Sequence, residues 1–247
     1  MDRLIYTAAS GAKHVMEQQA TTANNLANVS TTGFRSQIDT FRAVPVVQAG
    51  TLPTRTFVVD STTGADFSAG PLQATGRDLD IAIKGKGWLT VQMPDGTEAY
   101  TRNGAIQMNS NGLLETQQGL TLAGEGGPIT LPPDVTVTVG GDGTISTIEN
   151  GIKPGTATIL GKLKLVNPPE QDLVRGDDGL FRLKDGSAAQ VDPNVQAVGG
   201  MLESSNVNPV DSMVSMISLA RSFDMQMSLL KNAENNAAKA SQILALS

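Results

Sequence analysis

The fold of this chain is decided by the stretch NPVDSMVSMISLARSFDMQMSLLKNAENNAAKASQILALS, residues 208–247. Apolar residues recur there at every seventh position, which is the spacing of a helix that packs along a seam. These residues are Met216, Phe223, Leu230, Ala237 and Leu244. Further apolar residues, such as Ile217, Met225 and Leu229, fall on other faces of the same helix. The stretch therefore predicts one long helix that packs against more than one partner.

The start of this helix is marked by local signals. Asn208 is a suitable N-cap, Pro209 suits the first helical position, and Asp211 lies near the positive end of the helix dipole. Neither Gly nor Pro follows in the remaining residues. We therefore expect the helix to begin at Pro209 and to continue without a break.

A second amphipathic helix is predicted for residues 3–27, where apolar residues fall three and four positions apart. The residues that share one of its heptad positions are Ile5, Ala12, Gln19 and Leu26. This helix can therefore pair with the C-terminal helix along a seam. It should end where polar residues replace the pattern, with Asn28 or Gly33 in the left-handed cap conformation.

The chain between Ser36 and Gln73 carries weaker signals. Pro45, Pro53 and Pro71 are scattered among short β-prone pieces such as Thr56–Val59. Since proline removes a backbone donor and fixes φ, this part is expected to be extended and irregular.

The middle of the chain, residues 79–198, predicts an all-β domain. Short runs of alternating residues are separated by turn-forming dipeptides at regular intervals. The dipeptides are Asp95-Gly96, Asn103-Gly104, Asn111-Gly112, Asp142-Gly143, Asn150-Gly151, Asp178-Gly179 and Asp185-Gly186. Asn103-Gly104 in particular predicts a type I′ hairpin.

These patterns predict an α+β protein, in which N- and C-terminal α-helices pair as a coiled-coil-like stalk and a central all-β domain is inserted between them. The expected domains are a terminal helical domain (residues 1–30 and 208–247), an extended linker (31–75) and a β-rich domain (76–207). Two paired helices leave part of the C-terminal helix uncovered, and burying one Leu, Met or Phe is worth about 1.5–3 kcal/mol. We expect self-association or a partner to cover that surface.

Composition and charge exclude several classes of function. The 247 residues include no cysteine, which excludes disulfides, thiol catalysis and cysteine-ligated metals. A net charge of −6 without any basic run argues against a nucleic-acid partner. No apolar run approaches the length of a membrane span, so no direct membrane insertion is expected. The first residues do not form a cleavable secretory signal, so work outside the cytoplasm would need another export route.

Two features offer weak hints of small-molecule chemistry. The single histidine, His14, lies in the predicted N-terminal helix beside Lys13 and Glu17, where a solvated or interfacial role is expected. Gly85-Lys86-Gly87 resembles part of a phosphate loop, but a predicted strand follows it instead of a helix N-terminus. A turn or bulge is the better interpretation. We expect no catalytic residue, cofactor, metal or small-molecule substrate.

Two alternatives to a structural role remain open in the predicted β domain. Asp78, Asp80 and Glu98 could serve a carbohydrate-active enzyme if they converged in a cleft. The tripeptide Arg175-Gly176-Asp177 could act in cell adhesion, although a tight polar turn needs the same residue types.

The stretch ANNLANVSTTGFR, residues 23–35, closely resembles the signature of flagellar rod and hook proteins. Four further stretches resemble the same family, in the family's order. They are GPLQATG (70–76), LDIAIKGKG (79–87), YTRNG (100–104) and ESSNVN (203–208). Within the family, the opening residues 1–8 and the pair Trp88-Leu89 resemble proximal rod members, and distal rod members are the alternative.

The resemblance implies a structural axial subunit of the flagellar basal-body rod, located in the periplasm. Its terminal helices would form an inner tube that transmits torque, and the β domain would form an outer layer. The segment 31–75 would brace neighbouring subunits. The implied partners are other proximal and distal rod subunits and the flagellar type III export apparatus, which would export the chain without cleaving a signal peptide.

Subunit packing is expected to involve apolar residues of both helices and of the signature stretch. They are Leu4, Ile5, Ala12, Met16, Leu26, Phe34, Met213, Met216, Ile217, Ala220, Phe223, Met227, Leu230, Ala237 and Leu244.

Overall fold

The computed structural model describes residues 2–45, 56–149 and 157–245; the side chains of residues 2–4, 43–45, 56–63, 237, 240, 241 and 243–245 lie outside this description. The chain divides into two compact units. Unit 1 comprises residues 1–28, 37–66 and 207–247, and unit 2 comprises residues 29–36 and 67–206. The chain therefore passes from one unit to the other at residues 28/29, 36/37, 66/67 and 206/207.

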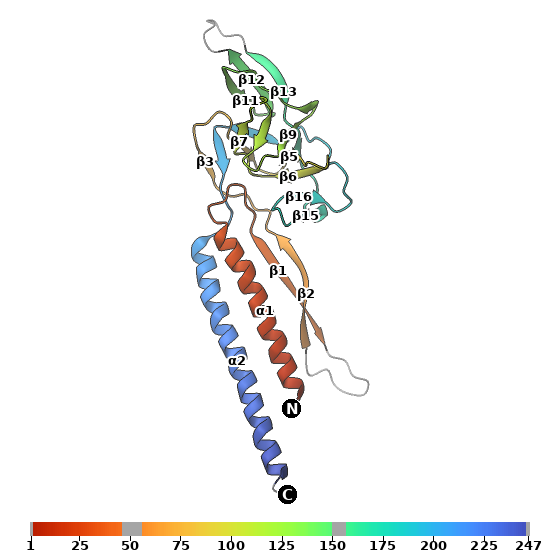
Figure 1. The fold of residues 1–247 in the computed structure, drawn as a ribbon, viewed down its shortest axis with the longest axis vertical. Coiled ribbons are helices and arrows are strands. Elements are labelled where there is room, and N and C mark those ends of the chain that lie inside the picture. The colour runs from red at the N-terminus through yellow and green to blue at the C-terminus, as the bar shows by residue number, and fades with distance from the viewer. Residues whose placement is uncertain (1, 46–55, 150–156, 246–247) are drawn as a thin grey trace. The chain divides into compact units, whose positions relative to one another are not determined.

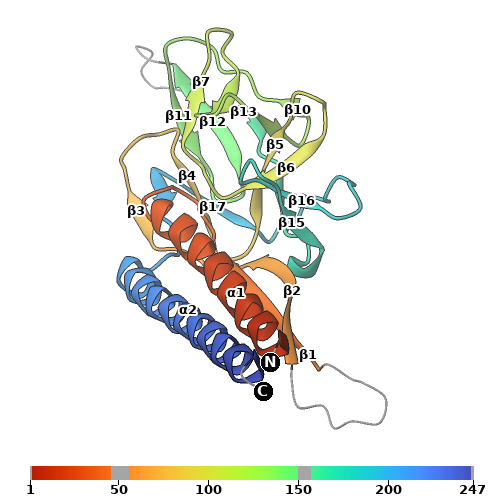
Figure 2. The same ribbon diagram turned by 60° about the horizontal axis from the view of Figure 1, so that its bottom comes forward.

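Unit 1 is built on the two terminal helices, α1 (Asp2–Ala27) and α2 (Pro209–Ala245). They lie side by side and antiparallel (Figures 1 and 2). Asn208 caps α2 as expected, because its Oδ1 accepts hydrogen bonds from the backbone N–H groups of Val210 (3.0 Å) and Asp211 (3.4 Å). The predicted position of both helices and their pairing are confirmed.

The predicted cap of α1 is wrong. The helix ends at Ala27, and the Asn28 N–H still donates to the carbonyls of Asn24 and Asn25 at 3.1 Å. Asp134 is the one non-glycine residue with positive φ in the described chain, so Asn28 is not left-handed. Gly33 has φ +68° but lies beyond the helix, in unit 2.

A β-hairpin in unit 1 replaces the irregular chain expected after residue 36. Strands β1 (Gln37–Pro45) and β2 (Thr56–Ala65) pair antiparallel, with a bulge between Thr40 and Phe41. The prediction was wrong because Pro45 does not interrupt the strand: it is the last residue of β1 and lies opposite Thr56 of β2. The hairpin packs against α1, whose Asn25 side chain exchanges two hydrogen bonds with the backbone of Gln37 (2.8 and 2.9 Å).

Unit 2 is almost entirely antiparallel β-structure, so the predicted all-β middle is confirmed. Its largest sheet has 9 strands in the order β15-β16-β6-β5-β9-β8-β7, with β10 paired to β9 and β14 to β5; separate sheets are β11-β12-β13, β17-β4 and β18-β3. The strand bounds are β3 (Leu72–Ala74), β4 (Ile81–Lys84), β5 (Trp88–Gln92), β6 (Glu98–Thr101), β7 (Ile106–Met108), β8 (Leu114–Thr116), β9 (Thr121–Gly124), β10 (Gly127–Pro128), β11 (Val135–Val139), β12 (Thr144–Glu149), β13 (Thr158–Lys162), β14 (Leu165–Val166), β15 (Leu173–Arg175), β16 (Phe181–Leu183), β17 (Gln196–Gly199) and β18 (Met201–Glu203). A short 3₁₀ helix, η1, covers Glu170–Asp172.

One core holds these sheets together. Fully or nearly fully buried aliphatic residues of β4, β5, β9, β12 and β14 meet in it, among them Ile81, Leu89 and Leu122. A second cluster consists of Phe67, Trp88 and Phe181, with the Trp88 and Phe181 ring centroids 4.7 Å apart. Strand β5 therefore lies buried on both faces, since Leu89 faces one cluster and Trp88 belongs to the other.

Most predicted turns lie where expected, for example Asp142-Gly143 between β11 and β12 and Asp178-Gly179 between β15 and β16. Asn150-Gly151 lies outside the described residues. The type I′ hairpin at Asn103-Gly104 is wrong, because β6 and β7 do not pair. The Gly104 carbonyl instead accepts from the Ile81 N–H at 2.9 Å, so this dipeptide joins two distant parts of unit 2.

Candidate functional site

Helix α2 of unit 1 presents a row of exposed apolar side chains, here called the α2 stripe. It consists of Val210, Met213, Val214, Ile217, Met225 and Leu229. Steps of three, four and eight residues place these side chains on one face of the helix. Their exposed fractions lie between 49% and 64%, which is high for large apolar residues.

The opposite face of α2 packs against α1. Its half-buried residues follow the alternating three- and four-residue spacing of a coiled-coil seam. They are Ser212, Met216, Leu219, Phe223, Gln226, Leu230 and Ala233. Helix α1 contacts both α2 and the β1–β2 hairpin, so it is covered on two sides, whereas α2 is covered on one. The α2 stripe is thus an apolar surface that the described part of unit 1 leaves uncovered.

The structure distributes the predicted packing residues over several environments. Ile5, Ala12, Leu26, Met216, Phe223 and Leu230 are half-buried or buried within unit 1. Met16, Met213, Ile217, Ala220 and Met227 are exposed. Leu4, Ala237 and Leu244 belong to the helices, but their side chains lie outside the described residues. Phe34 is buried in unit 2.

Four members of the α2 stripe were not among the predicted residues: Val210, Val214, Met225 and Leu229. A sequence signal for them exists, because Met213, Ile217, Met225 and Leu229 fall on one row of four-residue steps that Arg221 interrupts. The seven-residue periodicity instead predicts a seam on the opposite face, which α1 covers.

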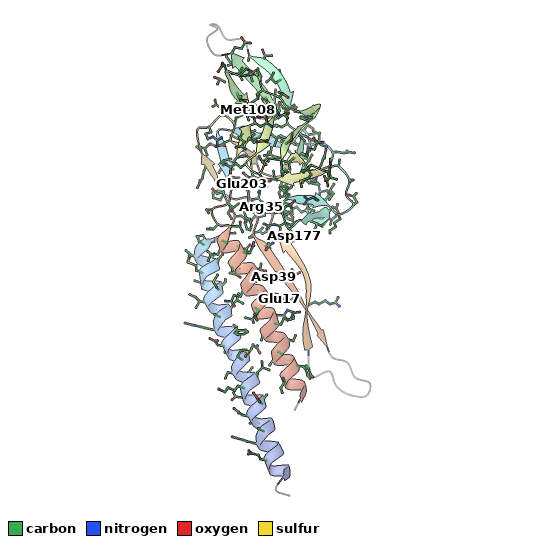
Figure 3. The ribbon with its side chains drawn as sticks, viewed as in Figure 1. Glu17, Arg35, Asp39, Met108, Asp177 and Glu203 are labelled. Atoms are coloured by element: carbon green, nitrogen blue, oxygen red, sulfur yellow. The ribbon has the colours of Figure 1, made fainter. Side chains whose placement is uncertain are left out.

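A second candidate feature lies in unit 2, where the carboxylate of Glu203 is buried between two arginines. Arg35 Nη1 donates to Glu203 Oε1 at 2.6 Å, and Arg102 Nη1 donates to Oε2 at 2.9 Å. The backbone N–H of Gly70 donates to Oε1 at 2.8 Å. Figure 3 shows Arg35 and Glu203 side by side. We call these four residues the Glu203 cluster.

The Glu203 cluster is a buried site with one more positive than negative charge. Burial lowers the pKa of Arg102, and the neighbouring carboxylate of Glu203 acts in the opposite direction. The Arg102 guanidinium also lies 5.3 Å from the centre of the Trp88 ring, and that of Arg35 lies 5.9 Å from it. Ring faces attract cations, so Trp88 contributes to holding the excess charge.

The Glu203 cluster joins sequence stretches that are far apart. Arg35, Gly70, Arg102 and Glu203 each come from one of the stretches that carry the family resemblance: 23–35, 70–76, 100–104 and 203–208. The signature stretch therefore does more than end the first helix, because its last residues are part of the β unit.

Asn206 makes a second connection next to the Glu203 cluster. Its Oδ1 accepts a hydrogen bond from the Ser36 N–H at 2.7 Å, and its Nδ2 donates to the Ser68 carbonyl at 3.1 Å. The backbone N–H of Asn206 donates to the Phe34 carbonyl at 3.4 Å. One asparagine thus holds together three of the segments at which the chain passes between units.

The alternative functions find no support in unit 2. Asp80 is buried beside Arg77 (3.3 Å), Glu98 pairs with Lys164 (2.5 Å), and Asp78 is exposed, so each carboxylate has a different environment. These differing environments do not match the shared cleft that the enzyme hypothesis requires. Gly85-Lys86-Gly87 is the connection between β4 and β5, as the turn interpretation predicted.

The arginine of the Arg-Gly-Asp sequence makes contacts within unit 2. Arg175 Nη1 donates to the Arg35 carbonyl at 3.0 Å, and its guanidinium lies 4.5 Å from the centre of the Phe34 ring. Through these contacts Arg175 fastens the β15–β16 hairpin to the signature stretch.

His14 projects from α1 of unit 1 toward the β1–β2 hairpin. Its Nδ1 is 3.1 Å from Glu17 Oε2, and its ring stands edge-on to that of Phe41 at 5.2 Å. Among the described residues there is no group of three or more acidic or histidine side chains that could hold a metal ion. No helix within the described ranges has the length and apolarity needed to cross a membrane.

Comparison with protein families gives three matches along the chain. Residues 5–35 match the family described as "Flagella basal body rod protein". Residues 82–147 match "Flagellar hook protein FlgE/F/G D1 domain", and residues 198–243 match "Flagellar basal body rod FlgEFG protein C-terminal". The matches cover α1 with the signature stretch, much of unit 2, and α2.

Individual relatives match over the whole chain. The flagellar basal-body rod proteins FlgF of Escherichia coli (strain K12) and of Salmonella typhimurium (strain LT2) are each 47% identical to this chain over 253 residues, covering 100% of both sequences. The flagellar basal-body rod protein FlgG of Buchnera aphidicola subsp. Schizaphis graminum is 32% identical, covering 90% of this chain and 92% of that protein.

Proposed function

Since this chain belongs to the flagellar basal-body rod protein family and is a structural subunit of that rod, we propose that it builds the proximal part of the rod by packing its terminal helices against those of neighbouring subunits. Family membership also confirms the expectation of a structural protein and not an enzyme.

The observation that carries this proposal is the α2 stripe. Six large apolar side chains stay exposed on one face of a helix whose other face is already paired. Burying a side chain of this size is worth about 1.5–3 kcal/mol, so covering the stripe strongly favours association. A neighbouring subunit offers helices of the same kind, which supports self-packing as the way the stripe is covered.

We favour the proximal over the distal position within the rod. The FlgF relatives match this chain over its full length at 47% identity, whereas the FlgG relative reaches 32%. The opening residues 1–8 and the pair Trp88-Leu89 support the same choice. The immediate partners in this proposal are other proximal subunits and the adjoining distal rod subunits.

Further parts of the proposal follow the family resemblance. The β1–β2 hairpin and the rest of residues 31–75 brace adjacent subunits, and the assembled rod transmits torque across the periplasm. The chain reaches the rod through the flagellar type III export apparatus without a cleaved signal peptide. The exposed apolar side chain of Ile38 on β1 supports the bracing role.

The experiment replaces two stripe residues by charged ones, Val214→Asp with Ile217→Asp, in the full-length chain. The matched control places the same number of charges on an exposed turn of unit 2, Gln117→Asp with Gln118→Asp. Both variants are produced in cells that lack the native subunit. We measure secretion into the medium, incorporation into purified basal bodies and swimming.

We expect the stripe variant to be secreted but absent from basal bodies, and the control variant to be incorporated. Incorporation of both at equal levels would refute packing through the α2 stripe. Antibody labelling of incorporated subunits then tests the proximal position, and label confined to the distal end of the rod would overturn that part.

A further inference from the structure

The terminal helices are attached to unit 2 through two segments. The incoming segment, residues 29–36, follows α1, and the outgoing segment, residues 203–206, precedes α2. Once the two helices have separated, tension along the chain enters unit 2 at Val29 and leaves it at Asn206.

The two segments are in direct contact. The Gly33 N–H donates to the Glu203 carbonyl at 2.7 Å, and the Ser36 N–H donates to Asn206 Oδ1 at 2.7 Å. The ion pair of Arg35 with Glu203 lies between these bonds, at 2.6 Å. Gly33 thus contacts the first residue of the outgoing segment and Ser36 its last. Since both segments advance in the same direction along these contacts, they run in parallel.

Parallel segments respond to this tension in a particular way. The incoming segment is pulled from its first residue and the outgoing segment from its last residue, in opposite directions. The segments must then slide past one another, and their bonds are strained together. Antiparallel neighbours pulled in the same way would open one bond at a time and yield at a lower force.

We infer that the incoming and outgoing segments form a shear clamp, which carries tension between α1 and α2 across the Arg35–Glu203 and Asn206 contacts and spares the β-sheets of unit 2. Each segment is also anchored to the unit, the outgoing one by the pairing of β18 with β3 and the incoming one by Arg175. This path depends only on contacts inside unit 2 and is independent of the subunit's position in a rod.

The geometry at Gly33 shows how closely the clamp is packed. Gly33 has φ +68°, and a Cβ at this position would lie 2.3 Å from the backbone carbon of Arg102. No other residue type fits without moving backbone. The tight turn lets the chain arrive from α1 and still run alongside the outgoing segment.

The test is single-molecule pulling in two directions. In the first, handles at the two termini of the full chain load the clamp after the helices separate. In the second, handles on Lys86→Cys and Asp177→Cys pull across the sheets between two exposed turns; the chain has no cysteine of its own to compete for the handles. Each direction is measured on the unsubstituted clamp, on Asn206→Ala, and on a control variant, Lys162→Ala, which removes a partly exposed ion pair with Glu125.

We expect unit 2 to rupture at a higher force in the terminal direction than across the sheets. In Asn206→Ala, the rupture force in the terminal direction should fall to the level measured across the sheets, and the force across the sheets should not change. In Lys162→Ala, the rupture forces in both directions should equal those of the unsubstituted chain. Equal forces in both directions for the unsubstituted clamp would overturn the inference. So would an equal loss in both directions for Asn206→Ala, because that pattern belongs to general destabilisation.

Discussion

Arg35 and Glu203 are 168 positions apart in the sequence, and their charged groups meet at 2.6 Å in the interior of unit 2, with both side chains fully buried. A buried ion pair of this kind adds little net stability, because the cost of removing two charges from water offsets much of their attraction. Loss of one partner is different, since the remaining charge stays buried and unpaired.

Glu203→Ala is therefore expected to be severely destabilising. It leaves the guanidinium groups of Arg35 and Arg102 buried without a counter-charge, which costs about 3–5 kcal/mol. Chemical denaturation followed by circular dichroism measures the change. The control is Glu170→Ala, which breaks an exposed ion pair with Lys86 and should cost at most about 1 kcal/mol. Similar losses for both substitutions would contradict the role given to the Glu203 cluster.

Gly33→Ala should destabilise unit 2 far more than Gly96→Ala. Both glycines have positive φ, at +68° and +84°, so each alanine adds about 1–2 kcal/mol of backbone strain. An added Cβ meets the Arg102 backbone at Gly33 and nothing within 4 Å at Gly96. The difference in unfolding temperature between the two variants, measured by calorimetry, reports the destabilisation caused by the steric clash with Arg102 alone. Equal unfolding temperatures would show that the signature stretch can move away from Arg102.

The pairing of α1 with α2 is tested by Ala8→Leu. Ala8 is buried one turn from Gly11, whose missing side chain leaves room for Gln226 of α2, so the two residues face the same helix. Forcing a leucine into this space should cost about 1–3 kcal/mol. Ala9→Leu, on the exposed side of α1, should stay within about 0.5 kcal/mol of the parent. Thermal melting followed by helical circular dichroism compares them, and melting of Ala8→Leu at the parent temperature would argue against close packing there.

Acid should destabilise unit 2 through its turn aspartates. The hydroxyl of Thr97 lowers the pKa of Asp95, and the guanidinium of Arg182 lowers that of Asp178, both from an ordinary 3.8. A carboxylate whose pKa is lower in the folded state stabilises fully above its unfolded pKa, and this stabilisation is lost as the pH falls through the folded value. The unfolding temperature should therefore stay level down to about pH 5 and then decline. Asp178→Asn should show a shallower decline, and an unchanged slope would exclude this carboxylate as a cause.

Local signals were sufficient to predict much of this fold. The N-cap, proline and acidic residue at the start of α2 act within one helical turn, and the aspartate turns form by bonding to a backbone N–H two residues later, as Asp95 does with Thr97. The Asn103-Gly104 prediction failed because β6 and β7 do not pair, and the dipeptide instead makes tertiary contacts: Asn103 Oδ1 accepts from the hydroxyl of Thr32, 71 positions away.

The candidate sites were less accessible to sequence reasoning. Periodicity placed apolar residues around α2, but which face remains uncovered depends on where α1 and the hairpin lie. The Glu203 cluster has no local pattern at all, because its arginines are 101 and 168 positions from the carboxylate. The family resemblance marked all four stretches without indicating that they meet.

Trp88 is the single tryptophan of the chain, and it packs against the rings of Phe67 and Phe181 with the guanidinium of Arg102 at its face. Indole fluorescence is sensitive to nearby charge and to solvent. The subunit thus contains a natural optical reporter beside the Glu203 cluster, and its emission can follow the state of unit 2 in solution or in an assembled rod without any added label.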